Sequence, residues 1–178
     1  MIVIGPEGTG KTVVINKITK MFALMGASDI LAKTAMSGVA TMFISGTTLH
    51  YWVGLPMILK RSEGWIERPS KKTKQRQEKN ITPTEYLVID EVSMATTEVM
   101  EAISAVAGFI KNNTTNPTQA FSRINVILVG DFHQFPPPGR EDLALYNGKP
   151  PTNTAAIGHV IFKQFNTVVI LKQQMNPG

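Results

Sequence analysis

An eight-residue loop near the start of the chain constrains the fold more than any other feature of the sequence. Residues 5–12 read Gly-Pro-Glu-Gly-Thr-Gly-Lys-Thr and match the phosphate-binding pattern G-x-x-x-x-G-K-[ST] at every fixed position. An apolar run, residues 2–4, precedes the loop, and an amphipathic pattern over residues 11–25 follows it. A strand, a glycine-rich loop and a helix in this order favour a nucleotide-binding α/β domain over the alternative of a simple glycine-rich turn.

The residue types in this loop suit phosphate chemistry. Gly5, Gly8 and Gly10 let the backbone curl so that successive N–H groups point at phosphate oxygens. The helix that begins near Lys11 adds the positive end of its dipole, and the Lys11 side chain adds a charge for the terminal phosphates. The Thr12 hydroxyl is a suitable ligand for Mg²⁺. We therefore predict a site for ATP and Mg²⁺ whose nucleotide-binding residues are Gly5, Pro6, Glu7, Gly8, Thr9, Gly10, Lys11 and Thr12.

Short apolar runs predict the strands, and none of them alternates apolar with polar residues along its length. They cover residues 2–4, 30–33, 86–89, 126–129 and 168–171. Continuous Val, Ile and Leu runs are typical of strands buried on both faces, as in parallel sheets. Helical patterns cover residues 11–25 and 97–111, and the predicted loops are residues 60–79, 112–119 and 136–151. We therefore predict one layered α/β domain over residues 1–178 with a mostly parallel sheet.

Composition excludes several classes of protein. The chain has 178 residues, is 43% hydrophobic and contains no cysteine, so a disulfide scaffold, a thiol nucleophile and a thiolate zinc site are ruled out. No apolar run approaches the roughly 20 residues that a membrane span needs, and no membrane association is expected. Residues 60–79, called the basic segment below, hold eight basic and three acidic residues, a net charge of 8 − 3 = +5 that equals the charge of the whole chain. Such a segment is either a contact for a polyanion or a solvated insertion.

Two carboxylates end the apolar run 86–89. Ligands of open α/β sheets bind at the carboxyl edge of the strands, which is where Asp90 and Glu91 are expected. Asp90 is predicted to hold the Mg²⁺, and Glu91 is predicted to act as the general base that takes a proton from the attacking water. The alternative is that both acids simply begin a helix, because acidic residues favour first turns.

A second polar cluster follows the run 126–129, which continues as Gly-Asp-Phe-His-Gln-Phe-Pro-Pro. Gln134 is a neutral donor and acceptor that suits sensing of a γ-phosphate or positioning of water. His133 is interpreted as a structural hydrogen-bonding residue. Metal binding by His50, His133 and His159 is not favoured, because no ligand spacing surrounds them.

These motifs together resemble the first motor domain of Pif-type DNA helicases, in the RecD-like branch of helicase superfamily one. The resemblance is carried by residues 5–12, by the string Asp-Glu-Val-Ser-Met at 90–94 and by Gly-Asp-Phe-His-Gln-Phe-Pro-Pro at 130–137. Residues 34–40 and 46–50 resemble the family's segment that contacts single strands. The matches extend over essentially the whole chain, and the implied fold is a P-loop NTPase domain of the RecA-like type.

The resemblance implies a motor that hydrolyses ATP, tracks along single-stranded DNA and unwinds forked duplexes in the 5′→3′ direction. It also implies roles in telomere maintenance, DNA repair and recombination, and residence in the nucleus. Carried over by position, the catalytic residues are Lys11, Asp90, Glu91 and Gln134, with Thr12 and Asp90 on the metal. The implied DNA contacts are Thr34, Ser37, Thr48 and His50. Trp52 is added on its residue type, because an indole there would stack on a base if it is not part of the core.

The sequence departs from the family pattern at two positions. Asn176 stands where the family has an arginine after a methionine, and asparagine lacks the charge that stabilises a developing γ-phosphate oxyanion. Glu7 stands where the family has a small residue, and its carboxylate repels phosphate unless it points outward. A helicase of this kind needs a second motor domain, so we expect these 178 residues to be part of a longer protein.

Two other functions remain open at this point. A small P-loop kinase or a non-helicase ATPase explains the loop and Asp90 but gives residues 34–50 no role. A catalytically incompetent piece of a helicase would bind nucleotide or DNA without unwinding. The sequence does not indicate an oligomeric state.

Overall fold

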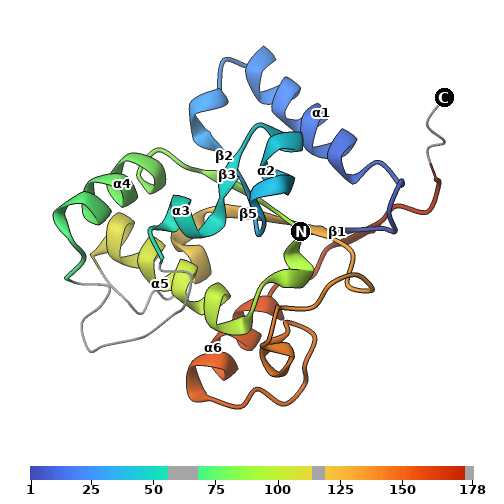
Figure 1. Cartoon of the computed structure of the whole chain (residues 1–178). Helices are drawn as coiled ribbons and strands as arrows, with labels where there is room; N and C mark the ends of the chain where they lie inside the picture. Colours follow the sequence, from blue (N-terminus) through green and yellow to red (C-terminus); the bar gives the residue numbers. More distant parts are fainter. Residues whose placement is uncertain (56–67, 114–118, 175–178) are drawn as a thin grey trace.

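The computed structural model describes residues 1–55, 68–113 and 119–174. Its centre is a six-stranded sheet in the order β3-β2-β4-β5-β1-β6, and every strand pairing in the described residues is parallel. The predicted mostly parallel α/β sheet is therefore confirmed (Figure 1). The strands are β1 (Ile2–Ile4), β2 (Leu31–Ala35), β3 (Thr47–Thr48), β4 (Tyr86–Asp90), β5 (Asn125–Gly130) and β6 (Val168–Ile170).

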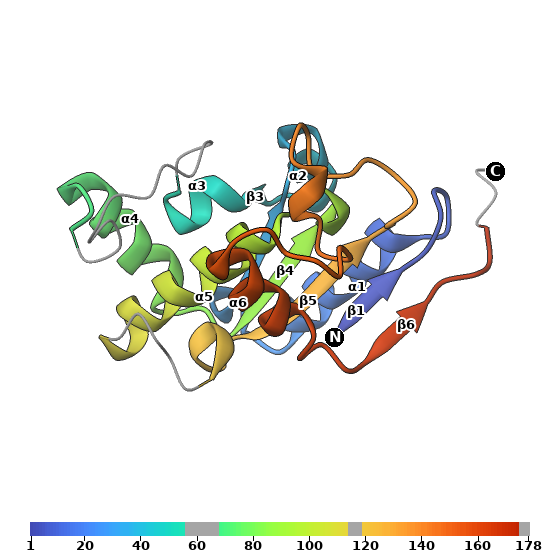
Figure 2. The ribbon, with the colours of Figure 1, turned by 90° about the horizontal axis from the view of Figure 1, so that it is seen from below.

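Helices cover both faces of this sheet. On one face lie α1 (Lys11–Leu24) and α2 (Gly38–Ile44), and on the other lie α5 (Thr97–Asn112) and α6 (Asn153–Phe162) (Figures 1 and 2). The helices α3 (Leu49–Val53) and α4 (Lys71–Ile81) lie side by side near the β3 edge. Short 3-10 turns complete the chain: η1 (Ser28–Ile30), η2 (Val92–Met94), η3 (Ala120–Arg123) and η4 (Glu141–Leu143).

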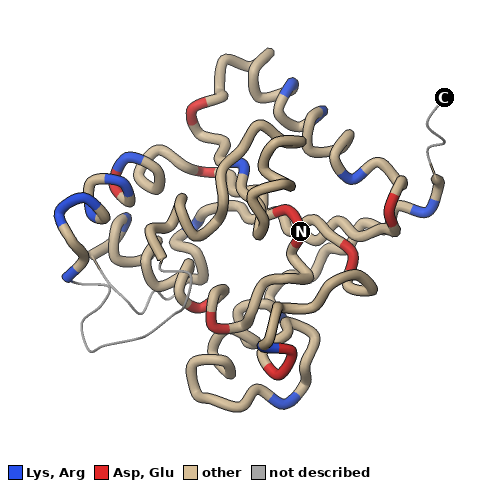
Figure 3. The backbone as a smooth tube through the Cα atoms, in the orientation of Figure 1, with Lys and Arg blue, Asp and Glu red and all other residues tan. Residues whose placement is uncertain are grey.

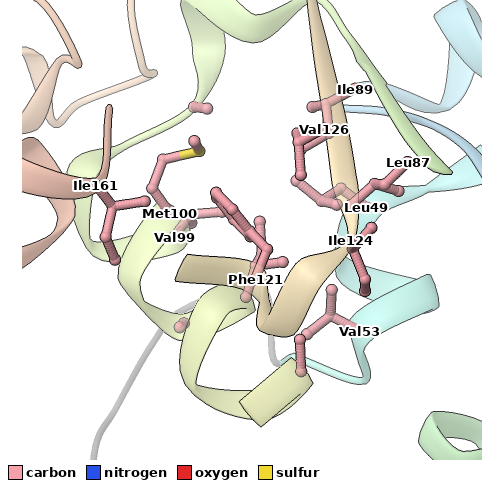
Figure 4. Packing of buried hydrophobic residues seen from close by; sticks show 14 of the residues in the cluster. Leu49, Val53, Leu87, Ile89, Val99, Met100, Phe121, Ile124, Val126 and Ile161 are labelled. Atoms are coloured by element: carbon pink, nitrogen blue, oxygen red, sulfur yellow. The ribbon is translucent and has the colours of Figure 1, made fainter. Parts of the chain in front are cut away.

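The two faces bury unequal cores. On the α5 face, Leu87, Ile89 and Val126 of the sheet pack against Met100 of α5 and Leu49 of α3 (Figure 4). Phe121, Ile124 and Ile161 extend this cluster. The α1–α2 face buries a smaller cluster: Val3, Ile15, Ala35, Ala40, Ile44, Val88 and Val129. The larger core therefore joins α3 to α5 and fixes the carboxyl edge of β4 from one side.

The predicted helices match the structure closely. The predicted range 11–25 corresponds to α1, which spans Lys11–Leu24, after which Gly26 takes a φ of 67° and ends the helix. The predicted range 97–111 corresponds to α5, which spans Thr97–Asn112, with Asn113 in the left-handed region. Both helices have a long amphipathic period and a residue that tolerates positive φ at the end, which are strong local signals.

Two predictions about strands need correction. β3 was not predicted, because two residues are too few to show a period. The run 168–171 was predicted to be buried on both faces, yet β6 lies at the sheet edge and Val168, Val169 and Ile170 are 52%, 40% and 57% exposed. An apolar run indicates a strand but does not indicate its place in the sheet.

The basic segment also differs from its prediction as a loop. Residues 60–67 lie outside the described residues, but α4 forms a helix over Lys71–Ile81. Ser70 begins this helix, and its hydroxyl accepts a hydrogen bond from the Thr73 N–H at 3.2 Å. The predicted loop at 112–119 lies partly outside the described residues, and the loop at 136–151 contains η4 with Leu143 buried. None of the helices in the described ranges is both long and apolar enough to cross a membrane.

Candidate nucleotide site

The phosphate-binding loop has the backbone that the sequence predicted. Gly8 and Gly10 have φ angles of 77° and 87°, which L-residues with a side chain rarely adopt. Lys11 at the start of α1 folds back over the loop, and its ammonium donates to the carbonyls of Gly5 at 2.7 Å and Pro6 at 3.0 Å. Glu7 is exposed, so its carboxylate lies outside the loop, which is the arrangement that lessens repulsion of phosphate.

The loop rests on the end of β6. A Cβ at Gly5 would lie 2.5 Å from the Thr9 hydroxyl and 2.9 Å from the Leu171 carbonyl, distances that real side chains do not adopt. Thr9 is buried, and its hydroxyl donates to the Pro6 carbonyl at 2.7 Å. Leu171 in turn donates its N–H to the Ile4 carbonyl at 2.8 Å. The close approach explains why glycine is needed at the first position of the loop.

Asp90 and Glu91 lie where the sequence predicted, at the carboxyl end of β4. Asp90 is 6% exposed, and its Oδ1 accepts the Glu91 N–H at 2.9 Å. Burial raises the pKa of Asp90 to about 6; the bond from the Glu91 N–H opposes this rise, the Glu91 carboxylate adds to it, and the Lys11 ammonium lowers it. Glu91 has a φ of 55°, a backbone conformation that costs a non-glycine residue energy and is common at functional sites.

Gln134 is placed by a turn that follows β5. Asp131 is 8% exposed, and its carboxylate accepts the His133 N–H at 3.0 Å while its carbonyl accepts the Gln134 N–H at 3.1 Å. This turn leaves Gln134 half-buried and His133 exposed. Because β5 pairs with both β4 and β1, the turn lies at the same sheet edge as Asp90 and the phosphate-binding loop.

The register of the sheet places the predicted DNA-contacting segment beside the nucleotide site. Ala35 pairs with Asp90 on one side and with Thr48 on the other. Neighbouring strands are about 4.8 Å apart, so the Thr48 and Asp90 backbones lie roughly 10 Å apart. The Met36 N–H also donates to the Asp90 carbonyl at 3.1 Å. The chain that leaves β2 toward Ser37 is therefore bonded directly to the residue predicted to hold the metal.

Ser37 and Thr48 each begin a short helix at this edge. The Ser37 hydroxyl accepts the Ala40 N–H at 3.2 Å, and the Thr48 hydroxyl accepts the Tyr51 N–H at 3.3 Å. A hydroxyl that accepts one bond keeps its proton to donate, so both side chains are able to bind a phosphate as well. His50 is half-buried, and burial lowers its pKa, which favours the neutral imidazole near pH 7.

Two of the predicted DNA contacts do not reach the surface. Trp52 is 5% exposed and belongs to the larger core, so the stacking role predicted for it is wrong and its alternative place in the core is confirmed. Thr34 is fully buried, and its hydroxyl donates to the Val88 carbonyl at 2.8 Å across the sheet. Its side chain ties β2 to β4 and does not face a ligand.

A cavity of about 490 Å³ adjoins His50. Its lining joins the end of β2 to the proline-rich turn after Gln134, through Met36, Met94, Pro137 and Pro138. Thr96, Glu98 and Arg140 supply polar atoms around it, and Arg140 forms an ion pair with Glu98 at 3.9 Å. The sequence did not indicate this cavity, because its walls come from segments about 100 residues apart.

The described residues contain no cluster of three or more His, Asp and Glu side chains able to hold a metal ion. Hard oxygen ligands for Mg²⁺ are instead available singly, from the Thr12 hydroxyl and the Asp90 carboxylate. The residue Asn176, where an arginine was expected, lies outside the described residues.

The parallel sheet, the glycine-rich loop before α1 and the acids after β4 define a P-loop nucleotide-binding domain. A family model described as PIF1-like helicase matches residues 1–149, and the chain belongs to this family. ATP-dependent DNA helicase RRM3 of Saccharomyces cerevisiae is 30% identical over 142 residues. That match covers 78% of this chain and 18% of the relative, so the chain spans less than a fifth of its length.

Solved structures share the fold. The crystal structure of Pif1 helicase from Candida albicans superimposes with a TM-score of 0.77 at 22% identity, covering 98% of this chain and 36% of that one. Pif1 helicase from Bacteroides in complex with ADP-AlF3 and single-stranded DNA gives a TM-score of 0.70 at 22% identity and covers 98% of this chain and 38% of that one. The protein is thus a PIF1-like helicase motor region with the fold of a RecA-like domain.

Proposed function

We propose that this chain binds ATP-Mg²⁺ and single-stranded DNA as the first motor domain of an ATP-dependent DNA helicase. In the complete protein, ATP hydrolysis would be coupled to unwinding of forked duplexes in the 5′→3′ direction. One observation carries the proposal: the Met36 N–H donates to the Asp90 carbonyl at 3.1 Å. Residues 34–50, which would contact single-stranded DNA, therefore share one edge of the sheet with the nucleotide site. The relative from Bacteroides solved with ADP-AlF3 and single-stranded DNA supports the pairing of these two ligands.

The loop provides the phosphate contacts. In the structure the Lys11 ammonium donates to two loop carbonyls, and phosphate oxygens are stronger acceptors that would take these bonds over. Backbone N–H groups of the loop and the start of α1, a helix of 14 residues, add the remaining positive potential. Pro6 and Glu7 shape the exposed side of the loop without offering a positive group.

The residues present fit a magnesium ion. Thr12 is half-buried at the start of α1, and Asp90 is a buried carboxylate beside the Lys11 charge, which together form the donor set that Mg²⁺ takes beside nucleotide phosphates. When bound, the ion neutralises charge on the phosphates during hydrolysis. A carboxylate with a raised pKa binds a cation at the cost of releasing a proton, so Asp90 couples metal binding to pH.

Glu91 and Gln134 act on the attacking water. Glu91 would accept a proton from the water as its oxygen bonds to the γ-phosphorus, while the bond to the β–γ bridging oxygen breaks. Gln134 would orient the water and detect the γ-phosphate through its amide. The Gln134 N–H donates to the Asp131 carbonyl at 3.1 Å, and this bond fixes the Gln134 backbone. The fixed backbone restricts the positions open to the Gln134 side chain.

The strand contacts follow the same edge. Ser37 and Thr48 would donate hydroxyl protons to DNA phosphates, and the neutral His50 would line the path beside the 490 Å³ cavity. Thr34 has a positioning role, because it holds β2 against β4. Roles of the complete protein in telomere maintenance, DNA repair and recombination, and its residence in the nucleus, are proposals that follow from the family.

The test compares ATP hydrolysis by the chain with and without single-stranded DNA. We expect slow turnover that the DNA increases, and Glu91→Gln should lose turnover while keeping the affinity for a fluorescent ATP analogue. Glu91→Gln keeps the size of the side chain and removes only the carboxylate that acts as the base. A loss of turnover with unchanged nucleotide affinity therefore reports lost chemistry and not lost folding.

Three outcomes separate the proposal from its alternatives. Hydrolysis that ignores DNA would favour a non-helicase ATPase or kinase. Nucleotide and DNA binding without hydrolysis would favour an incompetent chain that only binds. A chain that binds neither ligand, while folded by circular dichroism, would overturn the proposal.

A further inference from the structure

An exposed aromatic ring lies under a cation at the junction of α3 and α4. The Arg76 guanidinium carbon is 4.8 Å from the centre of the Tyr51 ring, within the range of a cation–π contact. Tyr51 is 56% exposed, so Arg76 covers only part of the ring. The rest of the ring is open to solvent and is therefore accessible to a ligand.

Both partners are held by regular structure. The Gln77 side-chain amide donates to the Val53 carbonyl and the Asn80 amide donates to the Trp52 carbonyl, each at 3.0 Å. These bonds fasten α4 to the end of α3, while Trp52 and Val53 anchor α3 in the core. The Tyr51 N–H donates to the Thr48 hydroxyl at 3.3 Å, which holds the Tyr51 backbone one turn after a residue that the proposal above places on a DNA phosphate.

The charge around the ring indicates the class of ligand. Figure 3 shows Lys and Arg positions gathered along α4, and Lys71, Lys72, Lys74 and Lys79 are exposed. Glu78 is the one acidic residue of this helix, and it pairs with Lys74 at 3.8 Å. The helix has five basic residues, so its net charge is 5 − 1 = +4. The exposed residues of α4 are polar or charged, so the helix lacks the apolar face that a membrane surface would require.

We propose that Tyr51 and Arg76, called the Tyr51–Arg76 platform, form a base-stacking contact for single-stranded nucleic acid, with the α4 lysines on the adjacent phosphates. The proposal rests on the strand binding proposed above and extends that path from Thr48 onto α4. Aromatic rings that stack bases beside basic side chains are typical of single-strand binding without sequence preference. Arg76 contributes by fixing the ring and by adding its charge to the platform.

The experiment measures the affinity of the 178-residue chain for a fluorescent oligothymidylate and for the same strand made of abasic nucleotides. Tyr51→Ala should weaken binding of the oligothymidylate about 5- to 150-fold, the range measured for stacking of one base. It should leave binding of the abasic strand unchanged, because that strand has nothing to stack. Tyr51→Trp keeps an aromatic ring and should preserve both affinities.

A second measurement needs no variant. A strand that carries 2-aminopurine reports stacking, because its fluorescence falls when the base stacks on a ring. We expect one position of the strand to be quenched on binding to the unaltered chain.

Thermal unfolding of Tyr51→Ala, compared with the unaltered chain, shows whether the variant keeps its fold.

The outcomes distinguish the two proposals. If the unaltered chain binds neither strand, the strand binding proposed for the chain is overturned, and the platform with it. If the chain binds but Tyr51→Ala loses affinity equally for both strands, or loses none, only the platform is overturned. Displacement of the strand by polyglutamate, with no difference between the base-containing and abasic strands, would show a general polyanion surface and would also overturn it.

Discussion

The end of this domain that holds the phosphate-binding loop, called the nucleotide end, is built differently from the end proposed to contact a DNA strand. The second end is called the strand-facing end. The nucleotide end is one continuous loop whose contacts are mostly backbone groups, with Gly8 and Gly10 at positive φ and Lys11 at the start of α1. The strand-facing end is an assembly of side chains from β2, β3, α3 and α4, held by hydrogen bonds such as the one from Asn80 to the Trp52 carbonyl. A single substitution at the nucleotide end can therefore abolish nucleotide binding, whereas single substitutions at the strand-facing end should weaken DNA binding by degrees.

The sharpest test of this difference is Lys11→Ala. Removing a charge-assisted bond to phosphate should weaken ATP binding about 10- to 150-fold, because each such bond contributes roughly 1.5–3 kcal/mol. Binding of single-stranded DNA without nucleotide should change little, because Lys11 lies on the other side of Asp90 from Thr48. Isothermal titration with each ligand measures both effects. Lys17→Ala, an exposed lysine of the same helix, is the control; equal losses of ATP and DNA binding would contradict the separation.

Asp90→Asn should stabilise the unliganded chain while disabling it. The folded pKa of Asp90 is raised to about 6 from the ordinary value of 3.8, so ionisation opposes folding once the pH exceeds about 4. Because asparagine keeps the oxygen that accepts the Glu91 N–H, the variant should gain up to about 3 kcal/mol in unfolding free energy at pH 7. The gain should shrink as the pH falls through 6 and vanish near pH 4.

Urea unfolding of both proteins between pH 4 and 8 measures this difference. A gain that does not depend on pH would show that the Asp90 charge is not its source. Magnesium-dependent ATP binding by Asp90→Asn should be lost at every pH in the range, because the amide is a poor ligand for Mg²⁺.

Gly5→Ala tests the contact between the loop and β6. The added methyl would meet the Thr9 hydroxyl and the Leu171 carbonyl, and overpacking of this kind costs roughly 1–3 kcal/mol. Thermal unfolding of the variant is compared with that of Gly148→Ala, where an added Cβ meets no atom within 4 Å. Equal stability of the two variants would mean that the loop moves away from β6 without cost.

The smallest predicted effect lies on α4. Replacing Lys71, Lys72 and Lys74 with alanine should lower the slope of log affinity against log salt for single-stranded DNA by about 0.7 for each phosphate that the variant no longer neutralises. ATP affinity should not change. Lys17 and Lys20 on α1 provide a control double variant with exposed lysines elsewhere. An unaltered slope would remove α4 from the DNA surface.

Sequence predicted the nucleotide end well because its information is local. Eight consecutive residues specify the loop, and Asp90 directly follows the apolar run 86–89, which lies in β4. The strand-facing end depends on packing between distant segments: Trp52 is buried because α4 covers the end of α3, and Tyr51 meets Arg76 across 25 positions of sequence. The exposure of β6 likewise depends on strand order, which apolar runs do not encode.

The contact between Gly5 and the end of β6 has a mechanical consequence. The Leu171 N–H is bonded to the Ile4 carbonyl at 2.8 Å, directly before the loop, and the Leu171 carbonyl lies against Gly5. A force that pulls on the chain after Leu171 would therefore act directly on the phosphate-binding loop, without first passing through a helix. In the reverse direction, a shift of the loop on binding or losing phosphate would displace Leu171, so the end of β6 and the phosphate-binding loop are expected to move together.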